Sequence, residues 1–487
     1  MKIAFVSSEV FPYAKTGGLA DVAGSLPIEL SKLGHEVKVF MPNYKSIDHN
    51  KYFINRIEII PDFPVRVGGW DRDVKLYNSF LPNSNVEIIF IDHPYYFHRN
   101  KIYTENWDED ERFIFFQKGF IETLQRLQWK PDVVNCNDWQ TGLIPLLVKD
   151  NYNWDSFFDN VKFVYTIHNI AYQGRFGKDT LKRAEIDPKF FNPPGIVEHG
   201  GDINFMKAGI MMSEIVSTVS ETYAKELLTS EYGAGMEGYL KYREQDFYGI
   251  VNGVDYEIWN PEKDESIPHK FSIDDLSGKK KNKQFLLEKF GLGYSENIPV
   301  IGIVSRMVSQ KGFDLIAKIM NQLMNMNIQL IVLGSGEAKY QSLFTNYAYY
   351  YPHKVGTYIG FSDELSHLIE AGSDMFLMPS NYEPCGLNQI YSLKYGTVPI
   401  VRKTGGLADT VQDWNEYNSY GLDIGNGFSF YDYSPAALLQ SIQRAVNDYN
   451  NKPVWQKIMK NGMIKDYSWK HSAEQYVELY KKAIGKV

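Results

Sequence analysis

The sequence has 487 residues, of which 44% are hydrophobic and 23% charged, and its formal net charge is −8. That length exceeds what one ordinary hydrophobic core organises and favours two domains. The composition is globular rather than disordered, and the acidic balance argues against a nucleic-acid partner or an anionic membrane surface as partner.

Cysteine usage and hydropathy bear on the compartment. Cys136 and Cys385 are the two cysteines, which argues against a disulfide framework and favours a reducing compartment. No apolar run is long enough to span a bilayer. The apolar start at residues 1–6 stops at Ser7-Ser8-Glu9, too early for a secretory h-region. We therefore expect a cytoplasmic protein.

The chain opens with a strand, a glycine-containing loop and a helix. Residues 2–6 form a short apolar run, residues 15–21 include two adjacent glycines, and residues 19–33 have helical spacing that ends at Gly34. Residues 36–40 are the next predicted strand. Further strands are predicted at 86–91, 132–135, 161–166, 215–219 and 247–251, with helices at 113–127 and 204–212. This alternation is typical of a parallel sheet with helices on both faces.

The pattern restarts in the second half of the chain. Residues 264–284 are polar and rich in charge, which suggests part of the crossing into a second domain. Later strands are predicted at 300–304, 329–333, 357–359, 375–378 and 398–401, and a helix at 472–484. The predicted fold class is α/β, with two Rossmann-like, doubly wound domains at 1–255 and 256–465 and a C-terminal helix within 466–487.

An octapeptide occurs almost twice. Residues 15–22 read KTGGLADV and residues 403–410 read KTGGLADT, so seven of eight positions are identical. Paired glycines admit a group close to the backbone, and a helix start offers free N–H donors that suit an anion such as a pyrophosphate. The alternative is two tight turns. Neither copy is the G-x-G-x-x-G fingerprint, so a nicotinamide cofactor is not favoured.

Polar side chains follow several predicted strands. Arg306 and Lys311 come after the strand at 300–304, where two cations suit the phosphates of a nucleoside diphosphate. Glu383 follows the strand at 375–378 and could hold sugar hydroxyls. His168-Asn169 and Asp138-Trp139 also stand at strand ends. Spacing alone also allows a structural role for each of them. Arg306 and Lys311 could be a solvated surface pair, and Glu383 a solvated loop carboxylate. His168 could be a structural histidine, and Asp138-Trp139 a capping Asp beside a core Trp.

The sequence contains no recognised metal-binding or nucleophile motif. H-E-x-x-H, C-x-x-C, G-x-S-x-G and P-loop patterns are absent. The triplet Asp71-Arg72-Asp73 resembles a DxD metal motif but lies in a polar stretch and is interpreted as surface. No metal and no cofactor are therefore predicted.

Taken together, the motifs resemble the bacterial glycogen synthase and plant starch synthase family. The segments that carry the resemblance are KTGGLADV at 15–22, IHNIAYQG at 167–174, Asn252–Asp255 with Trp259-Asn260-Pro261, 305–312, EPCGL at 383–387 and TVPIVRKTGGLADTV at 397–411. The resemblance implies a GT-B fold with a donor-binding cleft between the domains. It also implies a retaining, metal-independent transfer of glucose, usually from ADP-glucose in bacteria, to the non-reducing end of an α-1,4-glucan such as glycogen. The C-terminal helix is expected to cross back onto the first domain.

The resemblance also assigns roles. Catalytic roles fall on Glu383, His168, Arg306, Lys311 and Asp138. Substrate-binding roles fall on Lys15, Gly17, Gly18, Asp21, Asn169, Asn252, Cys385, Gly386, Leu387, Thr404, Gly405, Gly406 and Leu407. The sequence departs from the family pattern at Asn135, Gln140, Asn381 and Asn388, which we expect to affect the rim of the site and the acceptor preference.

Three alternatives stay open at this point. The donor could be UDP-glucose. The chain could be another GT-B enzyme, such as a sucrose- or trehalose-type synthase or a phosphorylase that binds pyridoxal phosphate. It could also be a non-catalytic glucan-binding protein that kept the fold. The sequence does not predict an oligomeric state.

Overall fold

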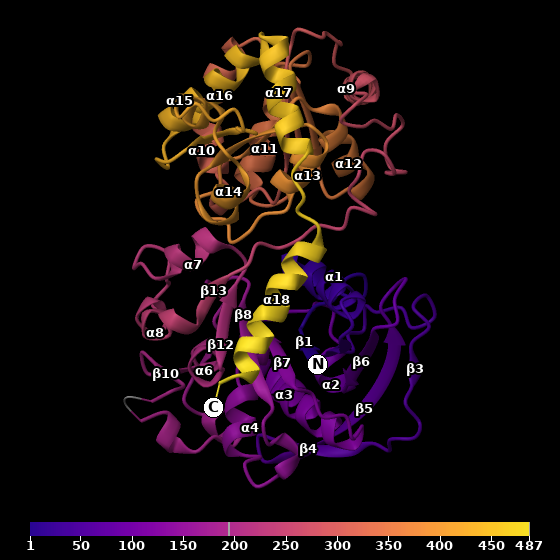
Figure 1. Ribbon diagram of the computed structural model, residues 1–487, viewed down its shortest axis with the longest axis vertical. Helices are drawn as coiled ribbons and strands as arrows, with labels where there is room; N and C mark the ends of the chain where they lie inside the picture. Colours follow the sequence, from indigo (N-terminus) through magenta and orange to yellow (C-terminus); the bar gives the residue numbers. More distant parts are fainter. Residues whose placement is uncertain (193–194, 487) are drawn as a thin grey trace. The chain divides into compact units, whose positions relative to one another are not determined.

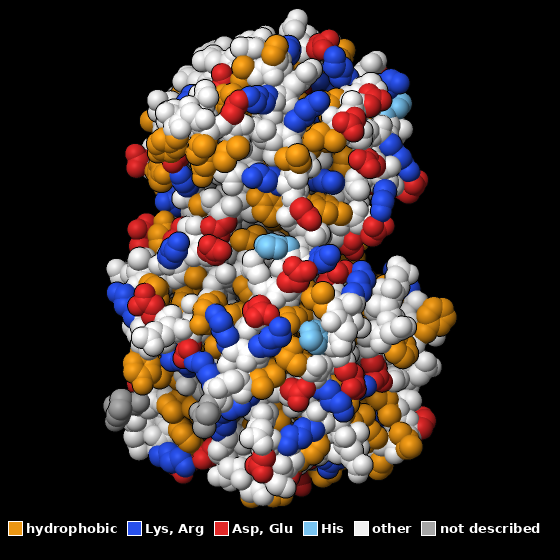
Figure 2. All heavy atoms as spheres, in the orientation of Figure 1, with side chains coloured by type: hydrophobic (Ala, Val, Ile, Leu, Met, Phe, Trp, Pro, Cys, Tyr) orange, Lys and Arg blue, Asp and Glu red, His pale blue; other side chains and the backbone are white. Residues whose placement is uncertain are grey.

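The computed structural model describes residues 1–192 and 195–486, which divide into two compact units (Figure 1). The first unit comprises Met1–Gly253 together with the segment that begins at Trp469. The second comprises Val254–Ser468. Lys, Arg, Asp and Glu side chains are interspersed over the face of both units shown in Figure 2.

The first unit is built on a largely parallel sheet of strand order β13-β12-β8-β7-β1-β2-β6-β5-β3, with β4 paired to β5. The parallel strands are β1 (Lys2–Val6), β2 (Glu36–Pro42), β6 (Glu87–Asp92), β7 (Val133–Asn137), β8 (Lys162–Ile167), β12 (Ile215–Thr218) and β13 (Phe247–Gly249). Its order reverses between β1 and β7, so the polar loops after these strands meet at one switch point.

One edge of this sheet was not predicted. Strands β3 (Asn55–Arg56), β4 (Phe63–Val67) and β5 (Trp70–Phe80) pair antiparallel. β5 has one half-buried face, and its sequence WDRDVKLYNSF is mostly polar, so an apolar run does not reveal it. A small second sheet has the order β10-β11-β9, from β9 (Arg175–Phe176), β10 (Glu198–His199) and β11 (Asp202–Asn204).

Helices cover the first sheet: α1 (Gly18–Lys32), α2 (Pro94–Phe97), α3 (Glu109–Arg126), α4 (Ile144–Asp150), α5 (Thr180–Ala184), α6 (Phe205–Met212), α7 (Glu221–Leu227), α8 (Glu237–Tyr242) and α18 (Trp469–Ile484). The described helices include none that combines the length and the apolar character needed to cross a membrane.

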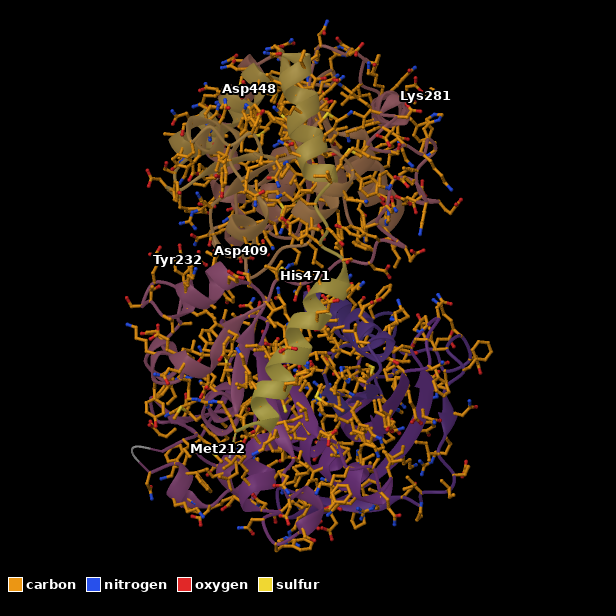
Figure 3. All side chains as sticks on the ribbon, viewed as in Figure 1. Met212, Tyr232, Lys281, Asp409, Asp448 and His471 are labelled. Atoms are coloured by element: carbon orange, nitrogen blue, oxygen red, sulfur yellow. The ribbon has the colours of Figure 1, made fainter. Side chains whose placement is uncertain are left out.

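The last helix, α18, packs against α1, β7, β8 and β12 of the first unit, and appears in Figure 1 as the yellow helix among indigo and magenta elements. Its buried positions recur every three or four residues, and His471 lies on its exposed face (Figure 3). Ser472 Oγ donates to the Val251 carbonyl at 2.7 Å, and the Tyr480 hydroxyl donates to Asn135 Oδ1 at 2.7 Å. Asn135 is fully buried here, so this departure from the family pattern lies in the core and not at the site rim.

The second unit is built on a parallel sheet of order β16-β15-β14-β17-β18-β19. Its strands are β14 (Val300–Val304), β15 (Gln329–Gly334), β16 (Val355–Ile359), β17 (Met375–Met378), β18 (Val398–Arg402) and β19 (Phe428–Phe430). The helices are α9 (Ser277–Lys289), α10 (Phe313–Asn325), α11 (Ala338–Tyr350), α12 (Asp363–Gly372), α13 (Asn388–Lys394), α14 (Gly405–Thr410), α15 (Trp414–Ser419), α16 (Pro435–Tyr449) and α17 (Lys452–Met463). The order reverses between β14 and β17, the strands that precede Arg306 and Glu383.

The polar stretch 264–284 lies inside the second unit rather than at the crossing, so that prediction was wrong. Its C-terminal part starts α9, and Lys279 in that helix is buried. The Lys279 ammonium donates to the Glu370 and Ala371 carbonyls and to Thr397 Oγ1, at 3.4, 3.2 and 2.6 Å. Burial lowers the pKa of Lys279 to about 7. The polar composition suggested a crossing because the sequence does not reveal that residues about 90 to 120 positions further along the chain supply three acceptors for Lys279.

The segment that enters the second unit is fixed by an aromatic stack. The Trp259 ring lies between the rings of His367 and Tyr391, with centroids 3.7 and 3.9 Å away and interplanar angles of 9° and 5°. His367 Nδ1 and the Tyr395 hydroxyl both bond Asp264 Oδ2, at 2.8 and 2.6 Å. The Trp-Asn-Pro motif therefore anchors this segment to α12 and α13.

Candidate active site

The loop after β1 is organised by Glu9, a residue that the sequence analysis did not assign to the site. Its buried carboxylate accepts hydrogen bonds from the backbone N–H groups of Thr16 and Gly17, the latter at 3.2 Å. The hydroxyls of Thr16 and Tyr103 donate to Glu9 Oε1, each at 2.6 Å. Glu9 thus fixes the conformation of the glycine loop through its bonds to Thr16 and Gly17. A buried Ser-Ser-Glu directly after a strand was the signal that could have revealed it.

The first copy of the octapeptide is open. A Cβ placed on Gly17 or Gly18 would meet no other described heavy atom within 4 Å. Lys15 Nζ pairs with Asp21 Oδ1 at 2.6 Å near the surface. Gly17 is the N-cap of the long helix α1, and no side-chain hydrogen bond from a described residue caps this end. The backbone here can accept a close ligand, and α1 directs its positive end toward it.

The second copy is packed. A Cβ on Gly405 would stand 1.8 Å from the Glu383 carbonyl oxygen, and one on Gly406 would stand 2.1 Å from that of Cys385. Gly405 also has a φ of +45°. Thr404 and Leu407 beside them are buried. These glycines therefore allow the Glu383–Cys385 backbone to pack against the start of α14. The sequence identity between the two octapeptides did not indicate this role.

Cations and one carboxylate gather at the switch point of the second unit. Lys311 Nζ pairs with Glu383 Oε2 at 2.6 Å, and Ser380 Oγ donates to the same oxygen at 3.0 Å. Gly312, at φ +82°, would carry a Cβ 2.1 Å from the Pro379 carbonyl, so glycine permits this close approach of the two loops. The Arg306 side chain is exposed and has no ionic or hydrogen-bonding partner among the residues that the structure describes.

These groups surround a cavity of about 210 Å³ that lies wholly within the second unit. Its wall includes Arg306, Lys311, Ser380, Glu383, Gly386, Leu387 and Asn388. Because Lys311 compensates Glu383, the unpaired Arg306 leaves an excess positive charge. The cavity therefore suits an anionic ligand with a polar, uncharged part beside Glu383.

At the switch point of the first unit, Asp138 bridges two strand-end loops. Its backbone has a φ of +56°, unusual for a residue with a side chain. Its carboxylate accepts hydrogen bonds from the backbone N–H groups of His168 and Asn169, at 2.7 and 3.4 Å. Burial raises the pKa of Asp138 to about 7, against the lowering effect of these two bonds. The structure thus brings together Asp138 and His168, two of the residues that the sequence placed in the site.

His168 is held as a neutral imidazole. Asn137 Nδ2 donates to the Val6 carbonyl at 2.9 Å, which leaves Asn137 Oδ1 facing His168 Nε2 at 2.8 Å. Nε2 must therefore carry the hydrogen, and Nδ1 remains an acceptor. Burial lowers the pKa of His168 to about 3. Asn137, which the sequence analysis did not single out, sets this tautomer.

Two further predicted site residues, Asn252 and Cys385, are buried. Asn252 is buried, and its Oδ1 has no partner within the described part of the chain. The Cys385 side chain is buried, and the described residues contain no disulfide. Among the family departures, Gln140 is buried and Asn388 lines the cavity, where its Nδ2 donates to the Val304 carbonyl at 2.9 Å. The Asn381 side chain is exposed.

Within residues 1–192 and 195–486, no three His, Cys, Asp or Glu side chains are grouped so as to hold a metal ion. Asp71 and Asp73 are exposed on β5, where they pair with Arg66 and Pro64 of β4. The triplet that resembles DxD is therefore a surface strand, as predicted.

Comparison with known proteins agrees with this geometry. A family model described as "Starch synthase catalytic domain" matches residues 2–242, and one described as "Glycosyl transferases group 1" matches residues 286–462. A glycogen synthase of Desulforudis audaxviator is 44% identical over 100% of this chain and 97% of its own length. A glycogen synthase of Pseudothermotoga lettingae is 44% identical over 100% of this chain and 99% of its own. The solved catalytic domain of starch synthase IV from Arabidopsis thaliana, bound to ADP and acarbose, has a TM-score of 0.91 and 32% identity, with 100% of this chain and 99% of that chain covered.

Two Rossmann-like units with polar switch points and this structural match define a GT-B glycosyltransferase. The chain belongs to the glycogen and starch synthase family, and its enzyme class is that of a glycosyltransferase of the glycogen synthase type. The predicted family, fold class and enzyme class are confirmed.

The contrast between the two glycine pairs predicts unequal effects of alanine. We expect Gly405→Ala to lower the free energy of unfolding by more than about 2 kcal/mol, because the new methyl group would collide with the Glu383 carbonyl at a positive φ. Gly18→Ala, at the open helix start, should change stability by about 1 kcal/mol or less. Urea denaturation of the full chain measures both. Equal losses in the two variants would contradict the difference in packing.

The raised pKa of Asp138 predicts a pH-dependent effect of Asp138→Asn on stability. Between about pH 4 and pH 7 the folded carboxyl keeps a proton that the unfolded one loses, so this group makes the wild type less stable as pH rises. The amide of Asn can accept the same N–H bonds and has no such dependence. We therefore expect Asp138→Asn to gain a few kcal/mol relative to the wild type from pH 4 to pH 8.

Calorimetric unfolding of both proteins at several pH values is the measurement. His168 has the opposite dependence, since its lowered pKa costs stability as pH falls from about 6.5 toward 3. That contribution is present in both proteins and cancels in their difference. A difference that stays constant with pH would mean that Asp138 ionises in its ordinary range.

Proposed function

We propose that the protein transfers glucose from ADP-glucose to the non-reducing 4-hydroxyl of an α-1,4-glucan, with retention at the anomeric carbon and without a metal ion. The observation that carries the proposal is the cavity of the second unit, where Lys311 compensates Glu383 and Arg306 remains unpaired among the described residues. An excess positive charge at a switch point is what a departing nucleoside diphosphate requires.

The donor assignment rests further on a solved relative. The starch synthase IV catalytic domain, 32% identical to this chain, was solved with ADP and acarbose. ADP is the nucleotide that transfer from ADP-glucose would release, and acarbose is a glucan-like oligosaccharide. The cytoplasm, where a nucleotide sugar would be available, is the location that we propose.

In the proposed reaction, the bond between the anomeric carbon and the phosphate oxygen breaks while the acceptor hydroxyl attacks from the same face. The new glycosidic bond forms, and the hydroxyl proton passes to the departing phosphate oxygen, which yields ADP. Arg306 and Lys311 stabilise the charge on the diphosphate. No protein nucleophile takes part in this scheme.

The groups of the first unit have supporting roles in the proposal. The neutral His168 offers Nδ1 as an acceptor for a sugar hydroxyl without adding positive charge. Asp138 holds the His168–Asn169 backbone in place.

Nucleoside diphosphate release tests the proposal. It is measured with ADP-glucose and with UDP-glucose, each with and without glycogen, in the presence of EDTA. We expect release that requires glycogen, persists in EDTA and is faster with ADP-glucose. Faster release with UDP-glucose would change the donor. Loss of release in EDTA would overturn metal independence, and release indifferent to glycogen would favour another GT-B enzyme. No release with either donor would favour a non-catalytic glucan-binding protein.

Charge-removing variants test the cavity itself. We expect Arg306→Ala and Lys311→Ala each to lower kcat/KM by at least about 100-fold, because the leaving group loses a cation that acts in the transition state. Lys281→Ala is the matched control, since Lys281 is exposed on α9 of the same unit (Figure 3). Equal effects of all three variants would contradict a specific role for the cavity.

A further inference from the structure

The parallel strands β14 and β17 separate toward their carboxyl ends, beside the cavity of the second unit. Their register covers two positions, Ile301 opposite Met375 and Gly302 opposite Phe376. Val304, the last residue of β14, lies beyond that register and lines the cavity. A strand that loses its neighbour leaves backbone groups on that side without a ladder partner. The end of β14 therefore needs another hydrogen-bond donor.

The Val304 carbonyl belongs to the side of β14 that faces β17. Backbone groups of successive residues in a strand point alternately to its two sides. The Ser305 N–H donates to the Leu333 carbonyl of β15 at 3.1 Å, whereas the Val300 carbonyl accepts from the Asp374 N–H, directly before β17, at 2.9 Å. Val304 stands four residues after Val300 and so shares its side.

A side chain supplies the donor that the ladder lacks. Asn388 Nδ2 donates to the Val304 carbonyl at 2.9 Å. Asn388 is the first residue of α13 and follows Gly386 and Leu387, which line the same cavity. The bond therefore joins the end of β14 to the start of α13. Because a partly buried carbonyl group without a donor costs free energy, this bond fixes where β14 ends.

Asn388 is itself held in place by α13 and its surroundings. Ser392 Oγ, one turn later, bonds the Asn388 carbonyl at 2.8 Å and the buried Glu370 carboxyl group of α12 at 2.7 Å. The neighbouring Gln389 amide donates to the Cys385 carbonyl at 3.0 Å. The start of α13 is therefore tied both to α12 and to the loop that carries Glu383, so its first side chain can position another element.

The segment that Asn388 fixes carries Arg306. Arg306 follows Val304 by two residues, and the next residue, Met307, donates its N–H to the Ser335 carbonyl at 2.8 Å. The exposed Arg306 side chain has no ionic or hydrogen-bonding partner in the described part of the chain, so its backbone determines where it lies. Bonds to Asn388 on one side and to Ser335 on the other thus set where the guanidinium group meets the cavity.

We propose that Asn388 is a positioning residue for the leaving group: through the Val304 carbonyl, it holds Arg306 where the diphosphate of the donor departs. The inference rests on the proposed function, because it assumes a nucleoside diphosphate in this cavity. It adds that Asn388, a position at which the sequence departs from the family pattern, contributes to phosphate stabilisation through another residue. A purely structural Asn388 would support the fold without any specific link to Arg306.

The test is a double-mutant cycle of Asn388→Ala and Arg306→Ala, assayed by ADP release from ADP-glucose with glycogen. We expect Asn388→Ala to lower kcat about tenfold and to leave KM for glycogen unchanged within about twofold. In the Arg306→Ala background the same change should lower kcat less than twofold, because the group that Asn388 positions is gone.

Asn461→Ala is the matched control. Asn461 Nδ2 donates to the Gly425 carbonyl of the same unit at 2.9 Å, and neither residue belongs to the cavity wall. Its removal breaks the same kind of bond and should leave kcat within about twofold in both backgrounds. Asn388→Leu keeps the side-chain volume without a donor, so it should match Asn388→Ala if the lost bond, and not a packing defect, is the cause.

ADP binding without glucan, measured by calorimetry, is the second readout, and we expect it to weaken about fivefold in both Asn388 variants but not further in the Arg306→Ala background. Unchanged kcat and ADP affinity in both variants would overturn the inference. So would a tenfold loss that persists in the Arg306→Ala background, or an equal loss in Asn461→Ala. A wild type that releases no ADP from ADP-glucose would instead overturn the proposed function, while calorimetry on the same cycle would still decide whether Asn388 acts through Arg306.

Discussion

The hydrogen bonds from the His168 and Asn169 backbones to the Asp138 carboxylate are the constraint on which the first unit's site depends. β7 and β8 are parallel neighbours, so their carboxyl ends meet, but two adjacent loops are not ordered by that alone. Asp138 joins them at the expense of a positive φ and a buried carboxyl group. From this junction follow the orientation of His168 and its hydrogen bond to Asn137.

A comparable constraint organises the second unit through backbone contact rather than through a carboxylate. The Glu383–Cys385 segment passes so close to Gly405 and Gly406 that no side chain fits there. That close approach fixes the backbone on which Glu383 meets Lys311, while Arg306 stays unpaired within the described chain. Two octapeptides that share seven residues thus have different physical roles. The glycines of the first copy leave the backbone open to a ligand, whereas those of the second copy pack against the Glu383–Cys385 backbone.

The two units also differ in charge and in chemistry. The second unit's cavity is cationic and suits a phosphate-bearing donor. The first unit's site instead presents the neutral His168 imidazole beside the buried Asp138 carboxyl group. This division matches what a glucan-elongating enzyme needs, since a donor must release a charged group whereas an acceptor presents only hydroxyls.

The sequence by itself determined much of this protein: the parallel strands, the glycine helix starts, the strand-end positions of Asp138, His168, Arg306 and Glu383, and the family. These features are local, because apolar runs and strand ends can be read from neighbouring residues. Only the tertiary structure decided which distant groups meet. It buried Lys279 beside the Glu370 and Ala371 carbonyls and brought Asn135 into contact with Tyr480 of α18. It also joined the Glu9 carboxylate to the backbone of the glycine loop and packed the second glycine pair against the Glu383–Cys385 backbone. Each of these depends on strand order and on contacts between residues far apart in the chain, and a local pattern contains no information about either.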